Sequence, residues 1–381
     1  MSGTGAINLE LWLGDMIASA APESVMKLLH EAEVTRVSDG PSTFKLSFRI
    51  DRESGNRKDF DLLTGGKVKP WTRILVRAQI GLETTSLIDG FVTGQSLSHD
   101  SESGASILTV TGEDVSVIMD RLQLSIEYPE MGDGVIAEIV LAKYTMVGIL
   151  PEVTPTPLDL VPQVVEHTPQ QNDTDRAFLA QMAQRNGYRF SVQPGTAPMT
   201  NIAKWGPPKN SGSAQKPLSV DLESATNVRS VQFSLDAAAP VQMLGMVQDD
   251  LSEEDLPIAT VMSSRSPALA TNPALDALGL MQRRDLYTDA RHGYLNALND
   301  VQVMTDTSSQ GALRAQGTLS TLRYGAVLEA PGLVDLRGAG TSYDGRYRVE
   351  QVVHSFARGK YDQNFILARE GTGSTISEVA A

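Results

Sequence analysis

Alternation of apolar and polar residues is the main pattern in the first third of the chain. In the stretch from residue 42 to 50 the apolar positions are Phe44, Leu46, Phe48 and Ile50, and the residues between them are polar or charged. A period of two predicts a β-strand with one buried and one wet face. Residues 71–80, 85–99 and 106–111 have a similar pattern, with turn residues at Gly81 and at Asp89-Gly90. The pattern predicts an antiparallel sheet or barrel over residues 1–115.

The period then changes to that of helices. Residues 114–122 and 134–146 have apolar residues at i, i+3 and i+4, and in the second stretch Val135, Ile139 and Ala142 form one stripe. Prolines break the chain between residues 151 and 171, which predicts an extended connection. A further helix is expected after it, because Asn172, Asp173 and Thr174 are suitable N-caps and Gly187 is a suitable stop. The apolar face of this helix is formed by Phe178, Leu179, Met182 and Ala183.

Strand patterns return towards the C-terminus. A helix is predicted over residues 307–316, followed by strands over 318–329, 332–337, 344–355 and 361–369. The predicted fold class is mainly β with α+β insertions, with two duplicated antiparallel β-barrel domains. The predicted division is a first barrel over 1–115, a middle α+β region over 116–227 and 241–300, a second barrel over 228–240 and 301–371, and a tail over 372–381.

Two strand regions resemble each other within the chain. Asp89-Gly90 and Asp344-Gly345 are each followed, nine positions after the glycine, by a histidine, His99 and His354 respectively. This alignment places Val92 with Tyr347, Gly94 with Val349 and Leu97 with Val352. The apolar parity slips by one between the second and third of these pairs in both copies, which a β-bulge explains. We interpret the match as a duplication, so that three chains would supply six similar barrels.

Composition removes several classes of function. The 381 residues include no cysteine, which excludes disulfides and thiolate chemistry, and the five histidines are too dispersed for a histidine-rich metal site. A net charge of −14 argues against binding nucleic acid through its phosphates. The N-terminal region lacks the features of a signal peptide, and no apolar stretch is long and clean enough to span a bilayer. We expect a soluble chain made in the cytoplasm.

Four motifs in a fixed order resemble the late control protein D family of phages, the baseplate hub proteins of contractile tails and related injection systems. They are the Asp89-Gly90-Phe91-Val92 strand, T-G-E-D at residues 111–114, N-D-T-D-R-A-F-L-A-Q-M-A-Q-R-N-G-Y at 172–188, and D-G-R-Y-R-V-E-Q-V-V-H at 344–354 closed by Y-D-Q-N-F-I-L-A-R. The resemblance covers residues 40 to 370. It implies structural roles for Asp89, Gly90, His99, Gly112, Asp114, Phe178, Leu179, Gly187, Tyr188, Asp344, Gly345, Tyr347, Val349, His354 and Tyr361.

The resemblance also implies the partners. Such hubs form a homotrimeric ring that joins a hexameric tail tube, or its initiator protein, to a trimeric central spike among other baseplate proteins. Since the chain ends at Ala381, the spike is expected to be a separate polypeptide. No cofactor, metal, tight nucleic-acid binding or membrane insertion is expected. The location implied is the tail baseplate or injection particle, assembled in the host cytoplasm.

Alternative functions have weaker support in the sequence. A cell-wall glycan hydrolase needs two carboxylates that flank a cleft, and Asp59 with Asp61, Glu113 with Asp114, and Glu253 with Glu254 are candidates. Neighbouring acids are common in a chain this acidic, so we favour a solvated surface and predict no enzymatic activity. A carbohydrate-binding β protein is disfavoured by the low aromatic content of 6%. For the hub, we hypothesise that the acidic residues concentrate on the lumen of the ring and keep passing DNA or effector from sticking.

Overall fold

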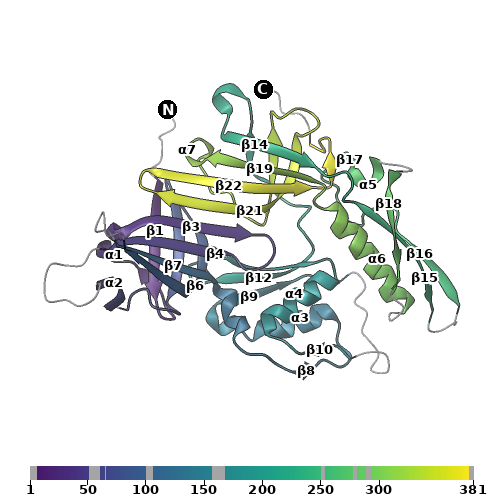
Figure 1. Ribbon diagram of the computed structural model, residues 1–381, viewed down its shortest axis with the longest axis horizontal. Coiled ribbons are helices and arrows are strands. Elements are labelled where there is room, and N and C mark those ends of the chain that lie inside the picture. Colours follow the sequence, from purple (N-terminus) through teal and green to yellow (C-terminus); the bar gives the residue numbers. More distant parts are fainter. Residues whose placement is uncertain are drawn as a thin grey trace.

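The computed structural model describes residues 7–50, 61–64, 66–99, 106–156, 168–249, 254–277, 281–288 and 293–376. The predicted class is confirmed, because the described chain is mainly β, with one large sheet and few helices (Figure 1). Among the described helices, none has the length and apolar character needed to cross a membrane.

Five antiparallel strands form what we call the first unit. Their order in the sheet is β3, β4, β7, β6, β5, with bounds Leu29–Val37, Thr43–Ile50, Ser106–Asp114, Glu83–His99 and Arg73–Ile80. Strand β1 (Ile7–Gly14) pairs antiparallel with β5, and β2 (Ser19–Ala20) pairs with β1. Helices α1 (Glu23–Leu28) and α2 (Asp61–Thr64) lie nearby in the chain. As predicted, the four apolar residues of β4 face the core.

Five more antiparallel strands form the second unit, in the equivalent order β14, β19, β22, β21, β20. Their bounds are Val228–Leu235, Leu313–Ser320, Lys360–Arg369, Gly345–Ala357 and Gly332–Arg337. Strand β13 (Gln215–Ser219) pairs parallel with β20, where the first unit has β1 antiparallel to β5. The short elements η3 (Glu223–Ala225) and α7 (Thr321–Tyr324) connect these strands. The same strand order in both halves supports the predicted duplication.

The pairing registers make the two units equivalent residue by residue. One row of directly opposed residues crosses β3, β4, β7 and β6, and a matching row crosses β14, β19, β22 and β21. The rows are Thr35, Thr43, Glu113 and Phe91, and Ser234, Arg314, Ala368 and Arg348. Strand β3 has a bulge at His30 and β14 has one at Arg229, each five residues before that strand's residue in the row. Strands β6 and β21 have bulges at Thr93 and at Glu350, each two residues after that strand's residue in the row. Registers and bulges therefore coincide in both copies.

The sequence alignment of the two units was wrong by two residues. It matched Val92 to Tyr347, whereas the registers make Val92 equivalent to Val349 and Leu97 equivalent to His354. The error comes from the Asp-Gly pairs. Asp344 precedes β21 and Gly345 begins it with a φ of +131°, but Asp89-Gly90 lies inside β6 and forms no turn.

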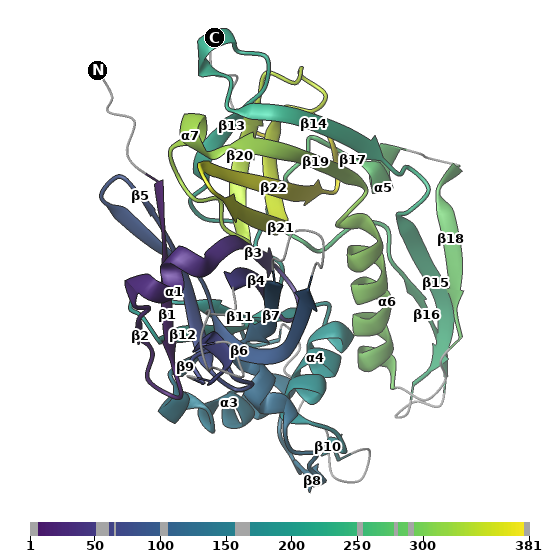
Figure 2. The same ribbon diagram turned by 60° about the vertical axis from the view of Figure 1, so that its left-hand side comes forward.

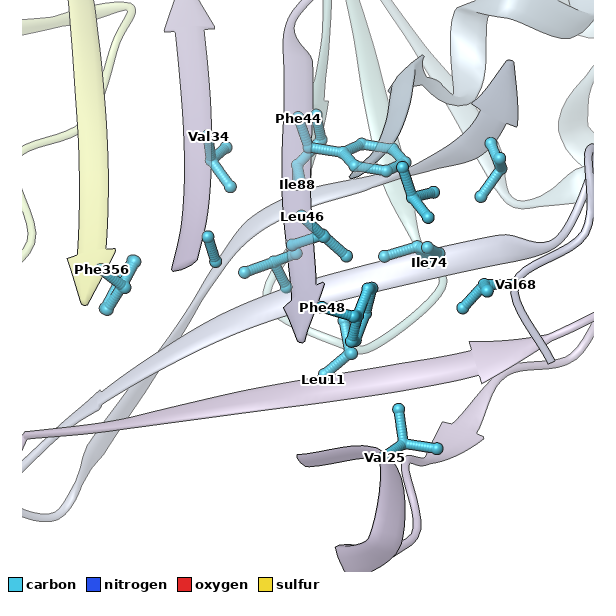
Figure 3. Packing of buried hydrophobic residues seen from close by; sticks show 14 of the residues in the cluster. Leu11, Val25, Val34, Phe44, Leu46, Phe48, Val68, Ile74, Ile88 and Phe356 are labelled. Atoms are coloured by element: carbon cyan, nitrogen blue, oxygen red, sulfur yellow. The ribbon is translucent and has the colours of Figure 1, made fainter. Parts of the chain in front are cut away.

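The two units share one continuous sheet. Residues 351–357 of β21 pair antiparallel with residues 31–37 of β3, so the fourth strand of the second unit joins the first strand of the first unit. Figure 3 shows Val34 of β3 and Phe356 of β21 beside Phe44, Leu46 and Phe48 of β4. A side chain of the second unit thereby completes the core of the first.

A middle region packs against the first unit, below the sheet in Figure 1. It contains the sheet β9 (Ile149–Val153), β12 (Asn201–Gly206) and β11 (Arg189–Pro194), with α3 (Asp133–Ala142) and α4 (Asp175–Arg185). Its short elements are η1 (Val115–Asp120), β8 (Ile126–Glu127), η2 (Thr145–Val147) and β10 (Gln170–Gln171). The stripe predicted for α3 was wrong: Val135 and Ile139 are exposed, because the helix buries Ile136, Ala137, Val140 and Leu141 instead.

A second insertion lies between β14 and β19. Strands β15 (Val241–Gln248), β16 (Asp255–Ala259) and β18 (Arg283–Tyr287) form a sheet that packs on α6 (Tyr294–Ser309), to the right of the main sheet in Figure 2. Only residues 307–309 of the helix predicted over 307–316 are helical, since β19 begins at Leu313. Strand β17 (Asn272–Pro273), next to α5 (Ala274–Ala277), pairs with β23 (Gly371–Thr372), so the start of the predicted tail is bound.

Candidate functional site

The T-G-E-D motif closes the first unit against the middle region. Asp114 accepts hydrogen bonds from the backbone N–H of Ser42 at 2.5 Å and of Ser116 at 2.9 Å, and it caps η1. Burial raises the pKa of Asp114 to about 6, against the lowering effect of these hydrogen bonds. Glu113 is bound by Arg176 of α4 at 2.6 Å. Both carboxylates of this predicted pair thus have structural partners.

Two glycines of the motifs permit close approach of strands. A Cβ added to Gly90 would lie 2.0 Å from the carbonyl oxygen of Glu113, and one added to Gly112 would lie 2.2 Å from that of Phe91. No side chain fits at either position without a shift of the backbone. This requirement explains glycine inside β6, where the sequence suggested a turn.

Asp89 forms the first buried joint between the sheet and the middle region. Arg73 donates to both carboxylate oxygens of Asp89, at 2.8 and 2.6 Å, and Asn201 of β12 donates to the same carboxylate at 2.7 Å. Arg73 also donates to the carbonyl of Met199 at 3.2 Å. Asp89, expected to lie in a turn, instead forms a fully buried, bidentate ion pair with Arg73. With the hydrogen bond from Asn201, this pair fixes β12 against β5 and β6.

A second joint, which sequence analysis missed, is centred on Glu350. This bulge residue of β21 accepts from Arg189 of β11 at 2.6 and 3.1 Å and from the Ser38 hydroxyl at 2.5 Å. Burial alone would raise the pKa of Glu350, but Arg189, Arg348 and Ser38 hold the pKa below its ordinary value. One carboxylate thus connects the second unit, the middle region and the first unit. The only sequence signal was the parity slip that predicted a bulge nearby.

The helical motif residues form the core of the middle region. Phe178 stacks on Tyr128, and the backbone carbonyl of Leu179 accepts from the buried indole N–H of Trp205 at 3.1 Å. Thr174 caps α4 as predicted, and Gly187 follows the helix with a φ of +60°. Tyr188 packs edge-on against Trp205 and donates to the carbonyl of Pro155 at 2.8 Å.

The C-terminal motif surrounds Arg369 in the second unit. Arg369 donates to the carbonyls of Asp344 and Ser342, both at 3.0 Å, and its guanidinium lies 4.2 Å from the ring centroid of Tyr347. A Cβ on Gly345 would lie 2.5 Å from an Arg369 nitrogen. Val349 belongs to the hydrophobic core of this unit.

The two histidines of the motifs are in different environments. His354 is fully buried where β21 meets β3, and its Nδ1 lies 2.9 Å from the Tyr361 hydroxyl. Burial, followed by the charge of Arg36, lowers the pKa of His354 to about 3, so its ring is neutral. His99 ends β6 on the surface, with Nδ1 3.0 Å from the Ser106 hydroxyl. The structure does not bring them together.

Metal and acid-base chemistry find little support among the described residues. No group of three histidines or carboxylates there is placed to hold a metal ion. Asp59, Glu253 and the side chain of Asp61 lie outside the described residues. Glu113 and Asp114 are engaged as described above.

The candidate functional surface is the side of the main sheet that faces away from its cores. We call it the polar face. It is defined by Glu31, Glu33, Thr35, Thr43, Lys45, Arg49, Gly94, Ser96, Ser98, Ile107, Thr109, Thr111, Glu113, Ser230, Gln232, Ser234, Arg314, Gln316, Thr318, Gln351, Val353, Ser355, Asn364 and Ile366. Two shallow hollows lie on it, one in each unit. Its charged members are three glutamates, one lysine and two arginines, so acids and bases balance on this face.

Comparison with known proteins identifies the fold. The chain is similar to a 43 kDa tail protein of prophage MuSo2 from Shewanella oneidensis, with a TM-score of 0.64 and 13% identity over 96% of this chain and 99% of that one. It is also similar to a tail protein from Neisseria meningitidis MC58, with a TM-score of 0.64 and 9% identity over 96% and 97% of the two chains.

A third similar structure is the E. coli c3393 protein, described as a component of the type VI secretion system. Its TM-score is 0.50 and its identity 13%, over 90% of this chain and 73% of that one. No protein-family model matches the chain, and no curated protein matches it in sequence. The chain therefore has a tail-protein fold, at identities where only the fold is shared.

Proposed function

We propose that this protein is a structural baseplate hub of a contractile tail or injection system, and that it belongs with the late control protein D proteins. The fold shared with tail proteins supports a tail or baseplate role. The observation that carries the proposal is the duplication, with one strand order and matching bulges in both units.

The duplication suits a protein that lies between two symmetries. Three chains related by a three-fold axis would present six similar sheet units, and a six-fold partner could contact all of them in nearly the same way. We propose that the two units are the tube-like domains expected over residues 1–115 and over 228–240 with 301–371. The middle region and the second insertion would then lie outside the ring of units.

The proposed partners follow from this position. One face of the homotrimeric ring would contact the hexameric tail tube or its initiator, and the other would seat a separate trimeric spike, alongside other baseplate proteins. Assembly would take place in the host cytoplasm. The role is organisational and needs no catalytic residue.

Light scattering on the purified protein tests the ring. A trimer has a mass of about 123 kDa, three times the 41.0 kDa of one chain. Co-expression with a candidate trimeric spike protein provides a second condition, because a hub can depend on its spike to trimerise. A monomer in both conditions contradicts the proposal.

A glycan hydrolase of the tail is the competing function. Zymography on peptidoglycan separates the two: a hub gives no clearing, whereas a hydrolase clears the gel and loses this activity when its carboxylates are replaced. The engaged states of Glu113 and Asp114 favour no clearing.

A further inference from the structure

The main sheet has two open edges, a different one in each unit. Strand β14 pairs only with β19, and β6 beyond Val92 pairs only with β7, among the residues that the structure describes. Unpaired edges present rows of backbone N–H and C=O groups that can accept another strand. Each chain thus offers one edge from each unit.

The junction inside the chain shows how such edges pair. There β21 of the second unit pairs with β3 of the first, with His354 opposite Val34 and Val353 opposite Thr35. By the registers given above, β21 is equivalent to β6, and β3 is equivalent to β14. The two open edges are therefore the same two edges that meet inside the chain, in the opposite units.

Burial differs between the occupied and the open positions. His354 and Val34 are each 0% exposed at the internal junction, whereas Leu97, the equivalent of His354, is 46% exposed. Leu235, the equivalent of the buried Arg36, is 45% exposed. Apolar side chains at core-facing positions of both open edges indicate that these edges become covered.

We propose that residues 94–99 of β6 in one copy pair antiparallel with residues 231–236 of a second copy, which include most of β14. Repeating the internal junction gives the register: Leu97 opposite Phe233 and Ser96 opposite Ser234. The contact is heterologous, because different edges meet, so it closes into a ring when the rotation allows. Closure at three copies rests on the proposed function. The main sheet would then run uninterrupted around the ring.

Engineered disulfides test this register, since the chain contains no cysteine. The variant S96C/S234C places thiols at a directly opposed pair on the polar face. Under mild oxidation we expect disulfide-linked oligomers that end at three chains, separable on a non-reducing gel. A one-to-one mixture of S96C and S234C single variants should give linked dimers only.

Two double-cysteine variants serve as matched controls. Val353→Cys with Thr35→Cys occupies the equivalent pair inside the chain and should form an intrachain disulfide. Ser96→Cys with Ser230→Cys moves one thiol four residues along β14, about 13 Å, which is beyond the reach of a disulfide. We expect no linked oligomers from it.

The outcomes separate the interface from the ring. A mass of about 123 kDa without S96C/S234C cross-linking overturns the strand pairing and leaves the trimeric hub standing. Specific cross-links that continue beyond three chains support the pairing and contradict the three-fold ring. A monomer that forms no cross-link at any concentration, while the internal control closes, counts against both.

Discussion

Two carboxylates, the buried Asp89 and the half-buried Glu350, hold the middle region against the continuous sheet, and each is bound by an arginine in two-point geometry. Removing one partner of a buried ion pair leaves the other charge unpaired in a medium of low dielectric constant. These residues therefore fix the relative positions of three parts of the chain, so their loss should be costly.

We expect Glu350→Gln to lower the free energy of unfolding by about 1–3 kcal/mol, because Arg189 would lose its half-buried counter-ion. Urea titration measures the change. Asp335→Asn, which breaks a partly exposed pair with Arg346 inside the second unit, is the control and should cost about 1 kcal/mol or less. Equal losses in the two variants would contradict a special role for Glu350.

The pH dependence of Glu350 has a definite sign. Its pKa is lower in the folded protein, so the stabilisation is present at neutral pH and is lost as the pH falls through the ordinary and then the folded pKa. The difference between wild type and Glu350→Gln should therefore shrink on acidification. Urea midpoints at neutral and acidic pH measure it, and a difference that grows on acidification would refute this assignment.

Asp114 should behave in the opposite way. Burial raises its pKa to about 6 in the folded protein, so ionising it costs stability as the pH rises from its ordinary value towards 6 and beyond. The rise in the pKa of Asp114 from its ordinary value to about 6 corresponds to a loss of about 3 kcal/mol in the free energy of unfolding once the carboxyl is ionised. Relative to Asp114→Asn, the wild type should lose stability between about pH 4 and pH 7. An NMR titration that places the carboxyl midpoint near its ordinary value would exclude this cause.

At the scale of elements, the close contact of β6 with β7 depends on a glycine. Gly90→Ala would push a methyl group to 2.0 Å from the Glu113 carbonyl oxygen, so we expect a loss of more than about 2 kcal/mol. Gly134→Ala is the control, because its Cβ meets nothing nearer than 3.5 Å and alanine favours the helix. Thermal unfolding of both variants compares them. If Gly90→Ala left the melting temperature unchanged, β6 and β7 would have to move apart at little cost.

The open edges can be blocked without harm to the fold. Leu97→Lys and Leu235→Lys place charges at half-exposed positions, so each should change monomer stability by about 0.5 kcal/mol or less but abolish assembly. Leu286→Lys, on the exposed side of β18, is the control and should assemble normally. Light scattering reports the mass of each variant. Trimers formed by both edge variants would argue against the proposed contact.

The elements that the sequence predicted well are those with a regular local pattern. The alternation in β4 and the cap and stop of α4 depend on neighbours in the chain, and both are present as predicted. The same holds for the mainly β class and the duplication, since the strands recur in one order.

The errors depend on contacts between distant residues. Asp89-Gly90 has the composition of a turn, but Arg73 and the Glu113 carbonyl group give both residues a place inside a strand. Helix α3 is apolar on several sides, so its pattern did not determine which side is buried. The Glu350 joint brings together residues 38, 189 and 350, whose proximity no local pattern contains.

For the whole molecule, the distribution of charge bears on assembly. Three chains carry a net charge of −42, three times −14, and like charges crowded around a channel would oppose ring closure. If the polar face lines the channel, its three glutamates are balanced by Lys45, Arg49 and Arg314. The hydroxyl and amide groups that dominate this face would then keep cargo from sticking without a concentration of acid.

This arrangement predicts that the ring is insensitive to salt. The Debye length falls from about 10 Å at 0.1 M salt to about 3 Å at 1 M, so an acidic channel would release subunits at low salt and recover them at high salt. We expect the mass from light scattering to stay constant over this range. As a contrast, Thr109→Glu with Thr318→Glu adds two carboxylates per chain to the polar face and should make assembly depend on salt. Dissociation of the wild type at low salt would instead place the acidic excess near the subunit contacts.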